Sequence, residues 1–229
     1  MIAQNVENVR KKIEEVCVRC GRKPEEITLV AVSKTFGVEK IREAAEAGVV
    51  DVGENYAQEL NEKKGKLADP NIRWHFVGHL QTNKAKYIAD YVHLIHTVDS
   101  ERLGSELQKR AEKAGRILDV LVEVHTTDEA TKYGVSPEKT LQLVKELSKF
   151  DRVRILGLMT MGPFSDDPNN SRPSFQHLVH LKKEIEREGI DNVQMKHLSM
   201  GMTHDFAVGI EEGATIVRIG TAIFGERGR

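Results

Sequence analysis

Residues 28–36 read TLVAVSKTF, a short apolar run that ends on Ser33 and is followed at once by Lys34. Short apolar runs bounded by polar residues are typical of strands that are buried on both faces, as in a parallel sheet. Such a strand has little room for an ammonium group. We therefore expect the strand to end at Ser33 and the side chain of Lys34 to lie just beyond it.

The same pattern recurs along the chain and predicts the fold. An amphipathic helix over residues 3–20 comes first, and segments with helical periodicity separate most of the apolar runs. Eight strands alternating with helices predict a single α/β domain over residues 1–229, a (β/α)8 barrel of the TIM type with an extra N-terminal helix. An open doubly wound sheet is the alternative. The eight expected strands cover residues 28–33, 49–53, 72–78, 93–98, 117–124, 153–161, 193–200 and 215–220.

The composition narrows the class of protein. The formal net charge of the 229 residues is -1, which gives no overall attraction for nucleic acid or an anionic membrane. We expect the local lysine cluster of Lys63, Lys64 and Lys66 to be a solvated helix face. No apolar stretch approaches the ~20 residues of a membrane span, and the N-terminus lacks an apolar signal core. The sequence therefore predicts a cytoplasmic protein.

In a (β/α)8 barrel, the functional side chains project from the carboxyl ends of the strands. Lys34 follows the first expected strand, so it would lie at the mouth of the barrel. The other residues that we expect to converge on the same rim are Glu54, Asn55, His79, Ser199, Gly201, Gly220 and Thr221.

The last two rim segments favour an anion. LSMGMTHDF (198–206) and RIGTAIFG (218–225) combine hydroxyl residues with glycine, which lets backbone N–H groups approach a phosphate closely. We also expect a short helix near Met200, whose N-terminus would face the anion. An amine opposite a phosphate site suits a phosphorylated aldehyde held as a Schiff base, particularly if Arg218 lowers the pKa of Lys34. The alternative is that Lys34 only ends the strand, with its ammonium group in water.

Several motifs resemble those of a known family, in order and spacing. They are AVSK (31–34), GENY (53–56), HFVGHLQTNK (75–84), GLMTMGP (157–163), LSMGMTHDF (198–206) and VRIGTAIFG (217–225). Together they resemble the small pyridoxal phosphate (PLP) homeostasis proteins, from Leu29 to Gly225. That family is in turn similar to the N-terminal barrel domain of alanine racemase, of the fold-type III PLP proteins.

The resemblance implies PLP as the cofactor and Lys34 as the residue that carries it as a Schiff base. It implies that Ser199, Gly201, Gly220 and Thr221 hold the phosphate and that Asn55 lines the pocket. Arg218 would lie near the pyridine nitrogen or the phosphate. Thr203 stands where the family commonly has serine and keeps the hydroxyl. Because an arginine presents donors only, it would keep a pyridine nitrogen unprotonated, which suits binding better than transamination.

The resemblance also implies a PLP carrier or regulator in intracellular PLP homeostasis, not an enzyme with robust catalysis. The alternative is an amino-acid racemase of the alanine racemase type, which needs an acid/base group on each face of the substrate. The second, β-rich domain that supplies one such group in alanine racemase is expected to be missing. We expect the local candidates Tyr56, His79 and His204 to be structural.

Two other classes of function remain open at this point, a Schiff-base aldolase and a pure interaction module. The expected partners are PLP and PLP-dependent apo-enzymes that receive it, with the protein itself a monomer. Stable absorbance on incubation with PLP would separate a PLP protein from an aldolase.

Two further signals favour packing over chemistry, and a third is open. Cys17 and Cys20 have the spacing of a redox or half-zinc motif, but they fall inside the first helix, with Cys20 on its apolar face. His75 and His79 share a strand face, whereas His93 and His96 should face opposite ways, so we expect no metal site. Residues 163–175 read as a polar loop, which either covers or recruits at the pocket or is simply solvated.

Overall fold

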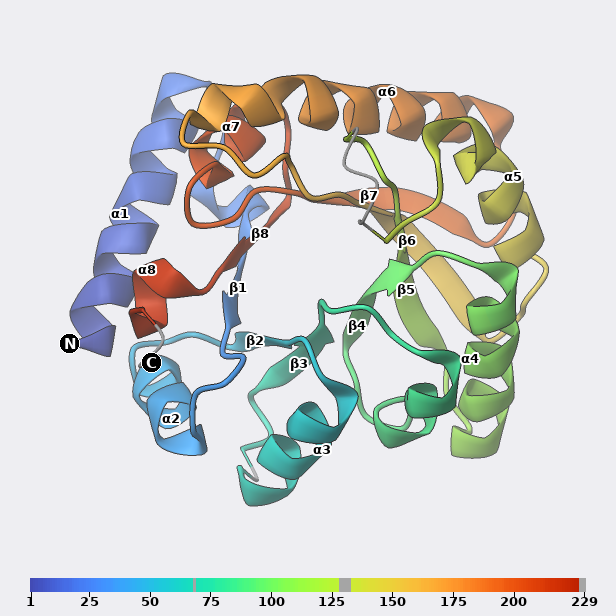
Figure 1. Ribbon diagram of the computed structural model, residues 1–229, viewed down its shortest axis with the longest axis horizontal. Helices are drawn as coiled ribbons and strands as arrows, with labels where there is room; N and C mark the ends of the chain where they lie inside the picture. The colour runs from blue at the N-terminus through green and yellow to red at the C-terminus, as the bar shows by residue number, and fades with distance from the viewer. Residues whose placement is uncertain (68, 128–132, 227–229) are drawn as a thin grey trace.

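The computed structural model describes residues 1–67, 69–127 and 133–226. Within them, eight parallel strands close into a barrel in chain order, with β1 paired to both β2 and β8 (Figure 1). This confirms the predicted (β/α)8 barrel and excludes the open doubly wound sheet. The strands are β1 (Thr28–Val32), β2 (Asp51–Glu54), β3 (Arg73–Phe76), β4 (Leu94–Val98), β5 (Leu118–Glu123), β6 (Val153–Met159), β7 (Val193–Ser199) and β8 (Ile216–Ile219).

Helices surround the barrel on the outside, as Figure 1 shows. In the third β/α unit a short 3-10 helix, η2 (Thr82–Tyr87), takes the place of an α-helix. Two other 3-10 turns are η1 (Pro24–Glu26) and η3 (Pro168–Ser171). The α-helices are α1 (Ile2–Arg19), α2 (Val38–Glu46), α3 (Ala57–Lys66), α4 (Glu101–Ala114), α5 (Pro137–Leu147), α6 (Arg172–Glu188), α7 (Phe206–Glu211) and α8 (Thr221–Phe224).

Helix α4 shows how local sequence sets these elements. Ser100 caps its start by accepting a hydrogen bond from the backbone N–H of Leu103. Gly115 ends it in the left-handed region, with φ of 65°. The residues buried on one face include Leu103, Leu107 and Ala111, at the 3–4 residue spacing of an amphipathic helix.

The core has two layers, because successive residues on a strand face opposite sides. The larger layer lies between strands and helices and takes up nearly all the buried side chains of the helices. The smaller layer fills the barrel and consists of Val30, Val32, Leu94, Leu121, Leu156, Met159 and Ile216. Towards the amino ends of the strands, two ion pairs join neighbouring strands, Arg73 to Asp51 and Arg154 to Asp119.

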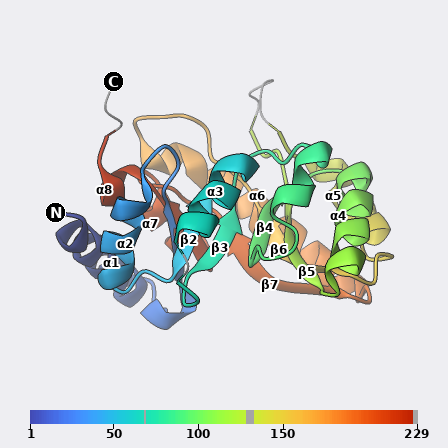
Figure 2. The same cartoon turned by 90° about the horizontal axis from the view of Figure 1, so that it is seen from below.

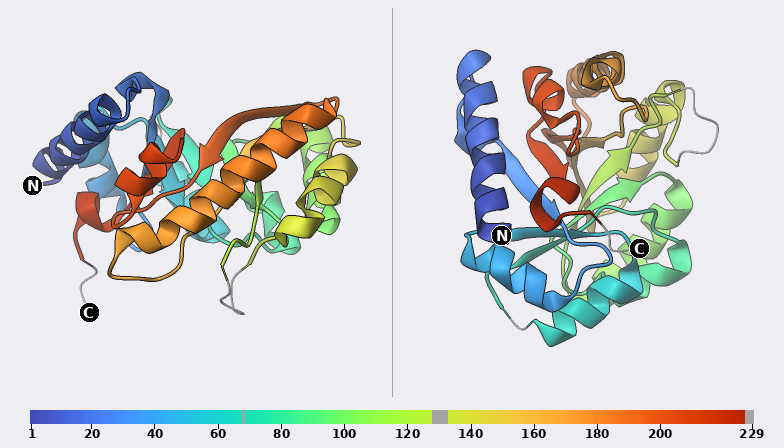
Figure 3. Two further views of the ribbon diagram at one scale, coloured as in Figure 1. Left: turned by 90° about the horizontal axis from the view of Figure 1, so that it is seen from above. Right: turned by 60° about the vertical axis from the view of Figure 1, so that its left-hand side comes forward.

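The N-terminal helix α1 packs among the helices that surround the barrel. It contacts α2, α7 and α8, and Figure 3 shows it alongside the last two of these helices. Asn5 Nδ2 donates to the carbonyl oxygen of Ile223 at 2.8 Å, which ties α1 to α8. Cys17 is fully buried and Cys20 only partly so, which reverses their expected order of burial. The Cys20 thiol lies 3.6 Å from the carbonyl oxygen of Cys17, so the two residues contact each other at the C-terminal end of this helix.

None of the helices in the described residues is both long enough and apolar enough to cross a bilayer.

Candidate functional site

Lys34 follows the last residue of β1 by two positions and is half-buried. The next residue, Thr35, has φ of 70°, a left-handed conformation that is uncommon for a β-branched residue. The connections after β1 and β6 and helix α8 lie on the same side of the barrel in Figure 2. Lys34 therefore stands at the mouth of the barrel, as the sequence predicted, on a backbone turn that the surrounding structure must hold.

Helix α3 supplies that support on both sides of Lys34. Lys63 Nζ donates to the carbonyl oxygen of Ser33 at 2.9 Å, and the Ser33 hydroxyl donates to Glu54 Oε1 at 2.5 Å. On the other side, the backbone N–H of Thr35 donates to Glu59 Oε1 at 2.8 Å. The two residues that flank Lys34 are thus each fixed by hydrogen bonds.

This arrangement corrects two expectations. Lys63 is buried, with its ammonium 2.6 Å from Glu54 and 2.7 Å from Glu59, so only Lys64 and Lys66 of the lysine cluster are exposed. Glu54 does not project from the rim: it faces outward, under α3, where burial raises its pKa despite the hydrogen bond from Lys63. A carboxylate at a strand end pairs with an overlying helix here, because adjacent strand residues face opposite sides.

The loops after β7 and β8 meet each other and β1. The backbone N–H of Arg218 donates to the carbonyl oxygen of Gly201 at 3.0 Å, and Ala222 N–H lies 3.5 Å from Thr203 Oγ1. Gly220 is close to β1, since a Cβ at this position would lie 3.3 Å from the carbonyl oxygen of Val32. Lys34 and both glycine-containing loops therefore occupy one sector of the rim.

Glycine is required at position 201. Its φ is 93°, and a Cβ there would lie 2.8 Å from the Cα of Phe206. Helix α7 begins at Phe206 and not near Met200, which corrects the expected helix start. The five residues from Gly201 to Asp205 form a turn held by Asp205, whose Oδ1 accepts from the backbone N–H of Met202 at 2.7 Å. Gly220 and the exposed Thr221 begin the short helix α8.

Arg218 and Ser199 are paired in the barrel interior. Arg218 Nη1 donates to Ser199 Oγ at 2.7 Å, and Nη2 donates to the carbonyl oxygen of Thr160 at 2.9 Å. Ser199 is 0% exposed, so its hydroxyl lies below the rim surface and not on it. Burial lowers the pKa of Arg218 to about 10, and the guanidinium stays charged at neutral pH.

Glu123 is a buried acid that the sequence reading missed. It is the last residue of β5, and its Oε2 is buried with no hydrogen-bond partner among the residues that the structure describes. Burial first, and then the charge of Asp99, raise its pKa to about 7, while Arg218 opposes the shift. The signal was present in the run ILDVLVEV, because Leu121 faces the barrel interior and Glu123 follows it on the same face.

Asn55 lines a separate cavity of about 380 Å³ beside the rim, together with Tyr56, His79 and Tyr133. The rings of His79 and Tyr133 stack with centroids 3.7 Å apart, and His79 Nδ1 lies 3.7 Å from Asp99. Tyr56 is exposed at the start of α3. Two of the three candidate second bases therefore lie near Asn55.

The third candidate base, His204, lines another cavity of about 260 Å³ with Met161, Pro163 and Phe164. Phe164 is 95% exposed. The expected loop over residues 163–175 is shorter than predicted, because η3 begins at Pro168 and α6 at Arg172. Whether this segment covers the pocket or recruits a partner stays a prediction.

His75 of β3 and His96 of β4 are buried inside the barrel, and the exposed His93, just before β4, lies beside His75. The rings of His93 and His96 both lie 5.2 Å from that of His75, and the predicted strand alternation does not apply to them because His93 lies before β4. Asp51, His75 and His93 bring ligand atoms within 4.8 Å of one another, a group that could hold a metal ion. Both oxygens of Asp51 are engaged by Arg73 and His75, and the predicted absence of a metal stays a prediction.

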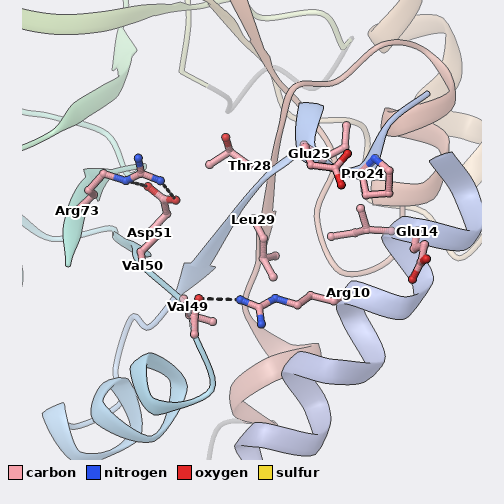
Figure 4. Close-up of a pocket in the computed structure, with 13 residues that line it drawn as sticks. Arg10, Glu14, Pro24, Glu25, Thr28, Leu29, Val49, Val50, Asp51 and Arg73 are labelled. Atoms are coloured by element: carbon pink, nitrogen blue, oxygen red, sulfur yellow. Dashed lines mark hydrogen bonds and ion pairs between the residues drawn. The ribbon is translucent and has the colours of Figure 1, made fainter. Parts of the chain in front are cut away.

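This end of the barrel also faces a cavity of about 560 Å³, shown in Figure 4. Its lining includes Asp51 and Arg73, which are joined in Figure 4, and Arg10, whose Nη2 donates to the carbonyl oxygen of Gly48 at 2.7 Å. Because these residues lie at the amino ends of the strands, this cavity opens opposite the rim that carries Lys34.

Comparisons with known proteins agree with the geometry. The sequence profile of the alanine racemase N-terminal domain family matches residues 2–228. A pyridoxal phosphate homeostasis protein of Aquifex aeolicus is 46% identical over 224 residues, which cover 98% of this chain and 97% of that protein.

Two solved structures extend the comparison. The structure of PipY from Synechococcus elongatus, described with PLP bound, superposes with a TM-score of 0.87 at 31% identity and covers 98% of this chain and 100% of that one. An alanine racemase of Clostridium difficile 630 has a TM-score of 0.74 at 15% identity and covers 99% of this chain and 58% of that one, which shows the shared fold alone.

Proposed function

The chain belongs to the pyridoxal phosphate homeostasis proteins, within the alanine racemase N-terminal domain family, and we propose that it binds PLP as a Schiff base on Lys34. The resemblance drawn from the motifs is thereby confirmed at the level of the family. When bound, the cofactor supplies an aldehyde that condenses with a lysine amine and releases water. We further propose that the protein acts as a carrier or regulator of PLP inside the cell.

One observation carries this proposal, the meeting of β1 with the two glycine-containing loops. Gly220 approaches the carbonyl oxygen of Val32, two residues before Lys34, and Thr203 lies beside the first turn of α8. An amine and a group of backbone donors thus share one sector of the rim. A ligand with an aldehyde at one end and a phosphate at the other fits such a pair of groups.

Each residue of this sector has a part in the proposal. Lys34 supplies the amine, Gly201 and Gly220 let the backbone approach the phosphate, and the backbone N–H of Thr221 at the start of α8 can donate to it. Thr203 adds a hydroxyl beside them. Arg218 presents only donors, so it would hold a pyridine nitrogen as an unprotonated acceptor.

The sequence prediction gave Ser199 a place on the phosphate. Its hydroxyl is fully buried and accepts a hydrogen bond from Arg218. We therefore propose that Ser199 serves the cofactor through Arg218. Asn55 remains a proposed pocket-lining residue, next to the cavity that it shares with Tyr56.

A carrier is favoured over a racemase by the positions of the candidate second bases. His79 stacks on Tyr133 and lies against Asp99, and Tyr56 is mostly exposed. A racemase base must be held within hydrogen-bond reach of its proton. We propose that none of the three serves as one, and that the recipients of PLP are PLP-dependent apo-enzymes.

The direct test is transfer of PLP from the loaded protein to a PLP-dependent apo-enzyme. We expect the wild type to be yellow, to activate the apo-enzyme, and to give no measurable racemisation of alanine. Lys34→Ala should be colourless and should transfer nothing, and Arg218→Gln should bind PLP more weakly. Loaded wild type that fails to activate any apo-enzyme, or that turns over alanine, would contradict the carrier function.

A further inference from the structure

A continuous line of hydrogen-bonded side chains runs through the barrel from Arg218 to Asp51. Arg218 Nη1 donates to Ser199 Oγ at 2.7 Å, and Ser199 Oγ lies 2.9 Å from His96 Nδ1. His96 Nε2 lies 3.0 Å from His75 Nδ1, and His75 Nε2 lies 2.8 Å from Asp51 Oδ1. All five residues are at most 4% exposed, so the whole line is shielded from water.

The line connects the two ends of the barrel. Asp51 begins β2, pairs with Arg73 and lines the cavity of about 560 Å³ at the amino ends of the strands (Figure 4). Arg218 lies near the carboxyl end of β8, and its backbone N–H contacts the Gly201 loop. A change at the Asp51 end can therefore reach the proposed cofactor pocket through four side chains.

With the His75 ring neutral, the direction of every hydrogen bond in the line follows from its acidic end. Although burial alone would raise the pKa of Asp51, hydrogen bonds from His75 and Arg73 lower it, so the carboxylate only accepts. His75 must then donate from Nε2, and in a neutral ring its Nδ1 accepts from His96 Nε2–H. Burial keeps the pKa of His96 well below its usual value, so this ring is neutral and its Nδ1 accepts the proton of Ser199.

These hydrogen-bond directions determine how Ser199 contacts Arg218. With its proton committed to His96, Ser199 Oγ presents a lone pair to Arg218 Nη1. Thr160 holds Nη2 through its backbone carbonyl at 2.9 Å, so the guanidinium is fixed at two points. A guanidinium is planar and rigid, so two fixed nitrogens set the direction of the remaining N–H groups.

We propose that Asp51, His75 and His96 are positioning residues that act through Ser199 to set the orientation of Arg218 toward the cofactor. This inference rests on the proposed PLP-binding function. Elsewhere in the barrel interior the space is filled by apolar side chains, such as Leu121 and Ile216. Buried polar groups are costly to retain there, which a purely space-filling role does not explain.

The first test uses the cofactor-free protein, so that it stands apart from PLP binding. Two-bond ¹H–¹⁵N spectra of histidine-labelled protein report which ring nitrogen carries the proton. We expect His75 and His96 both in the Nε2–H form, and we expect the Arg218 Nε–H resonance to move when His75→Phe interrupts the line. A His96 ring protonated at Nδ1, or an Arg218 resonance unmoved by His75→Phe, would overturn the inference.

The second test measures PLP affinity and the absorption maximum of bound PLP in the loaded protein. His75→Phe touches neither Arg218 nor Ser199, and Asp51→Asn keeps the shape of the side chain in case His75→Phe fails to fold. We expect both variants to weaken PLP binding at least threefold and to shift the absorption maximum.

The matched control is Asp119→Asn. Asp119 forms the equivalent ion pair with Arg154 at the same end of the barrel, and within the described chain neither has a hydrogen bond to the line. The Asp119→Asn variant should keep the PLP affinity and the absorption maximum of the wild type. Wild-type values in both His75→Phe and Asp51→Asn would overturn the inference. Failure of the wild type to bind PLP would instead contradict the proposed function and leave the spectra of the cofactor-free protein to decide this one.

Discussion

Lys63 Nζ donates to the backbone carbonyl oxygen of Ser33 at 2.9 Å, and this contact joins helix α3 to the residue that precedes Lys34. The same ammonium lies 2.6 Å from the buried carboxylate of Glu54. The amine at the barrel mouth is therefore carried by a segment whose position depends on a buried ion pair. Strand β1 alone would not fix it, because Thr35 turns away in the left-handed region.

Replacing Lys63 by methionine should be strongly destabilising. Glu54 would stay buried with no cation beside it, and loss of one partner of a buried pair typically costs about 3–5 kcal/mol. Urea unfolding of the cofactor-free protein measures this. The double variant Lys63→Met/Glu54→Gln should recover part of the loss, and the exposed neighbour substitution Lys64→Met should be nearly neutral. Equal effects of Lys63→Met and Lys64→Met would show that the pair does not support the segment.

Much of this site can be predicted from the sequence, but the ion pair of Lys63 with Glu54 cannot. The apolar run before Lys34 marks the strand, and the glycines of the last two loops mark the places where the backbone turns. The pairing of Lys63 with Glu54 joins residues nine positions apart on a helix and a strand, and local periodicity carries no sign of it. A lysine in a cluster of lysines looks solvated until the fold brings carboxylates to it.

Glu123 should make stability depend on pH. Its pKa rises from 4.5 to about 7 on folding, so the folded state holds this proton more tightly than the unfolded chain does. Stability is then fully present below the lower value and falls as the pH rises through this range, by up to about 3 kcal/mol. Glu123→Gln removes the titration, so the variant should gain on the wild type at pH 8 and match it near pH 4.

The measurement is chemical denaturation of both proteins at several pH values. A constant difference in free energy of unfolding between wild type and Glu123→Gln across that range would contradict the expectation. Sequence reasoning could have found this residue, since an acid at the inward position of a strand end is unusual. It could not have found its neighbours Asp99 and Arg218, which come from other parts of the barrel.

Gly201→Ala should reduce both stability and PLP affinity. The position has φ of 93°, and a Cβ would meet the Cα of Phe206 at 2.8 Å, so the loop must shift. Gly213→Ala is the matched control, because its φ is 101° but nothing lies within 4 Å of the added Cβ. We expect Gly213→Ala to lose about 1–2 kcal/mol from backbone strain alone and to keep its PLP affinity.

Thermal unfolding and PLP titration of the two variants give the comparison. Gly201→Ala that binds PLP as tightly as Gly213→Ala does would show that the loop after β7 is not part of the cofactor site.

The fold was predictable because eight β/α units repeat one local pattern, and eight such units are the number that closes a TIM-type barrel. Places where the prediction was wrong have long-range causes. Helix α7 begins at Phe206 because Asp205, which also accepts a hydrogen bond from Ser171 Oγ 34 positions away, holds the preceding turn through Met202. Ser199 is buried because His96 and Arg218, from two other strands, converge on its hydroxyl.

Covalent binding of PLP by Lys34 can be tested on the protein itself. Borohydride reduction of the loaded protein, followed by proteolysis and mass spectrometry, locates the modified residue directly. We expect a single reduced PLP adduct on the peptide that contains Lys34, and none in Lys34→Ala. An adduct on another lysine, with Lys34 unmodified, would contradict it.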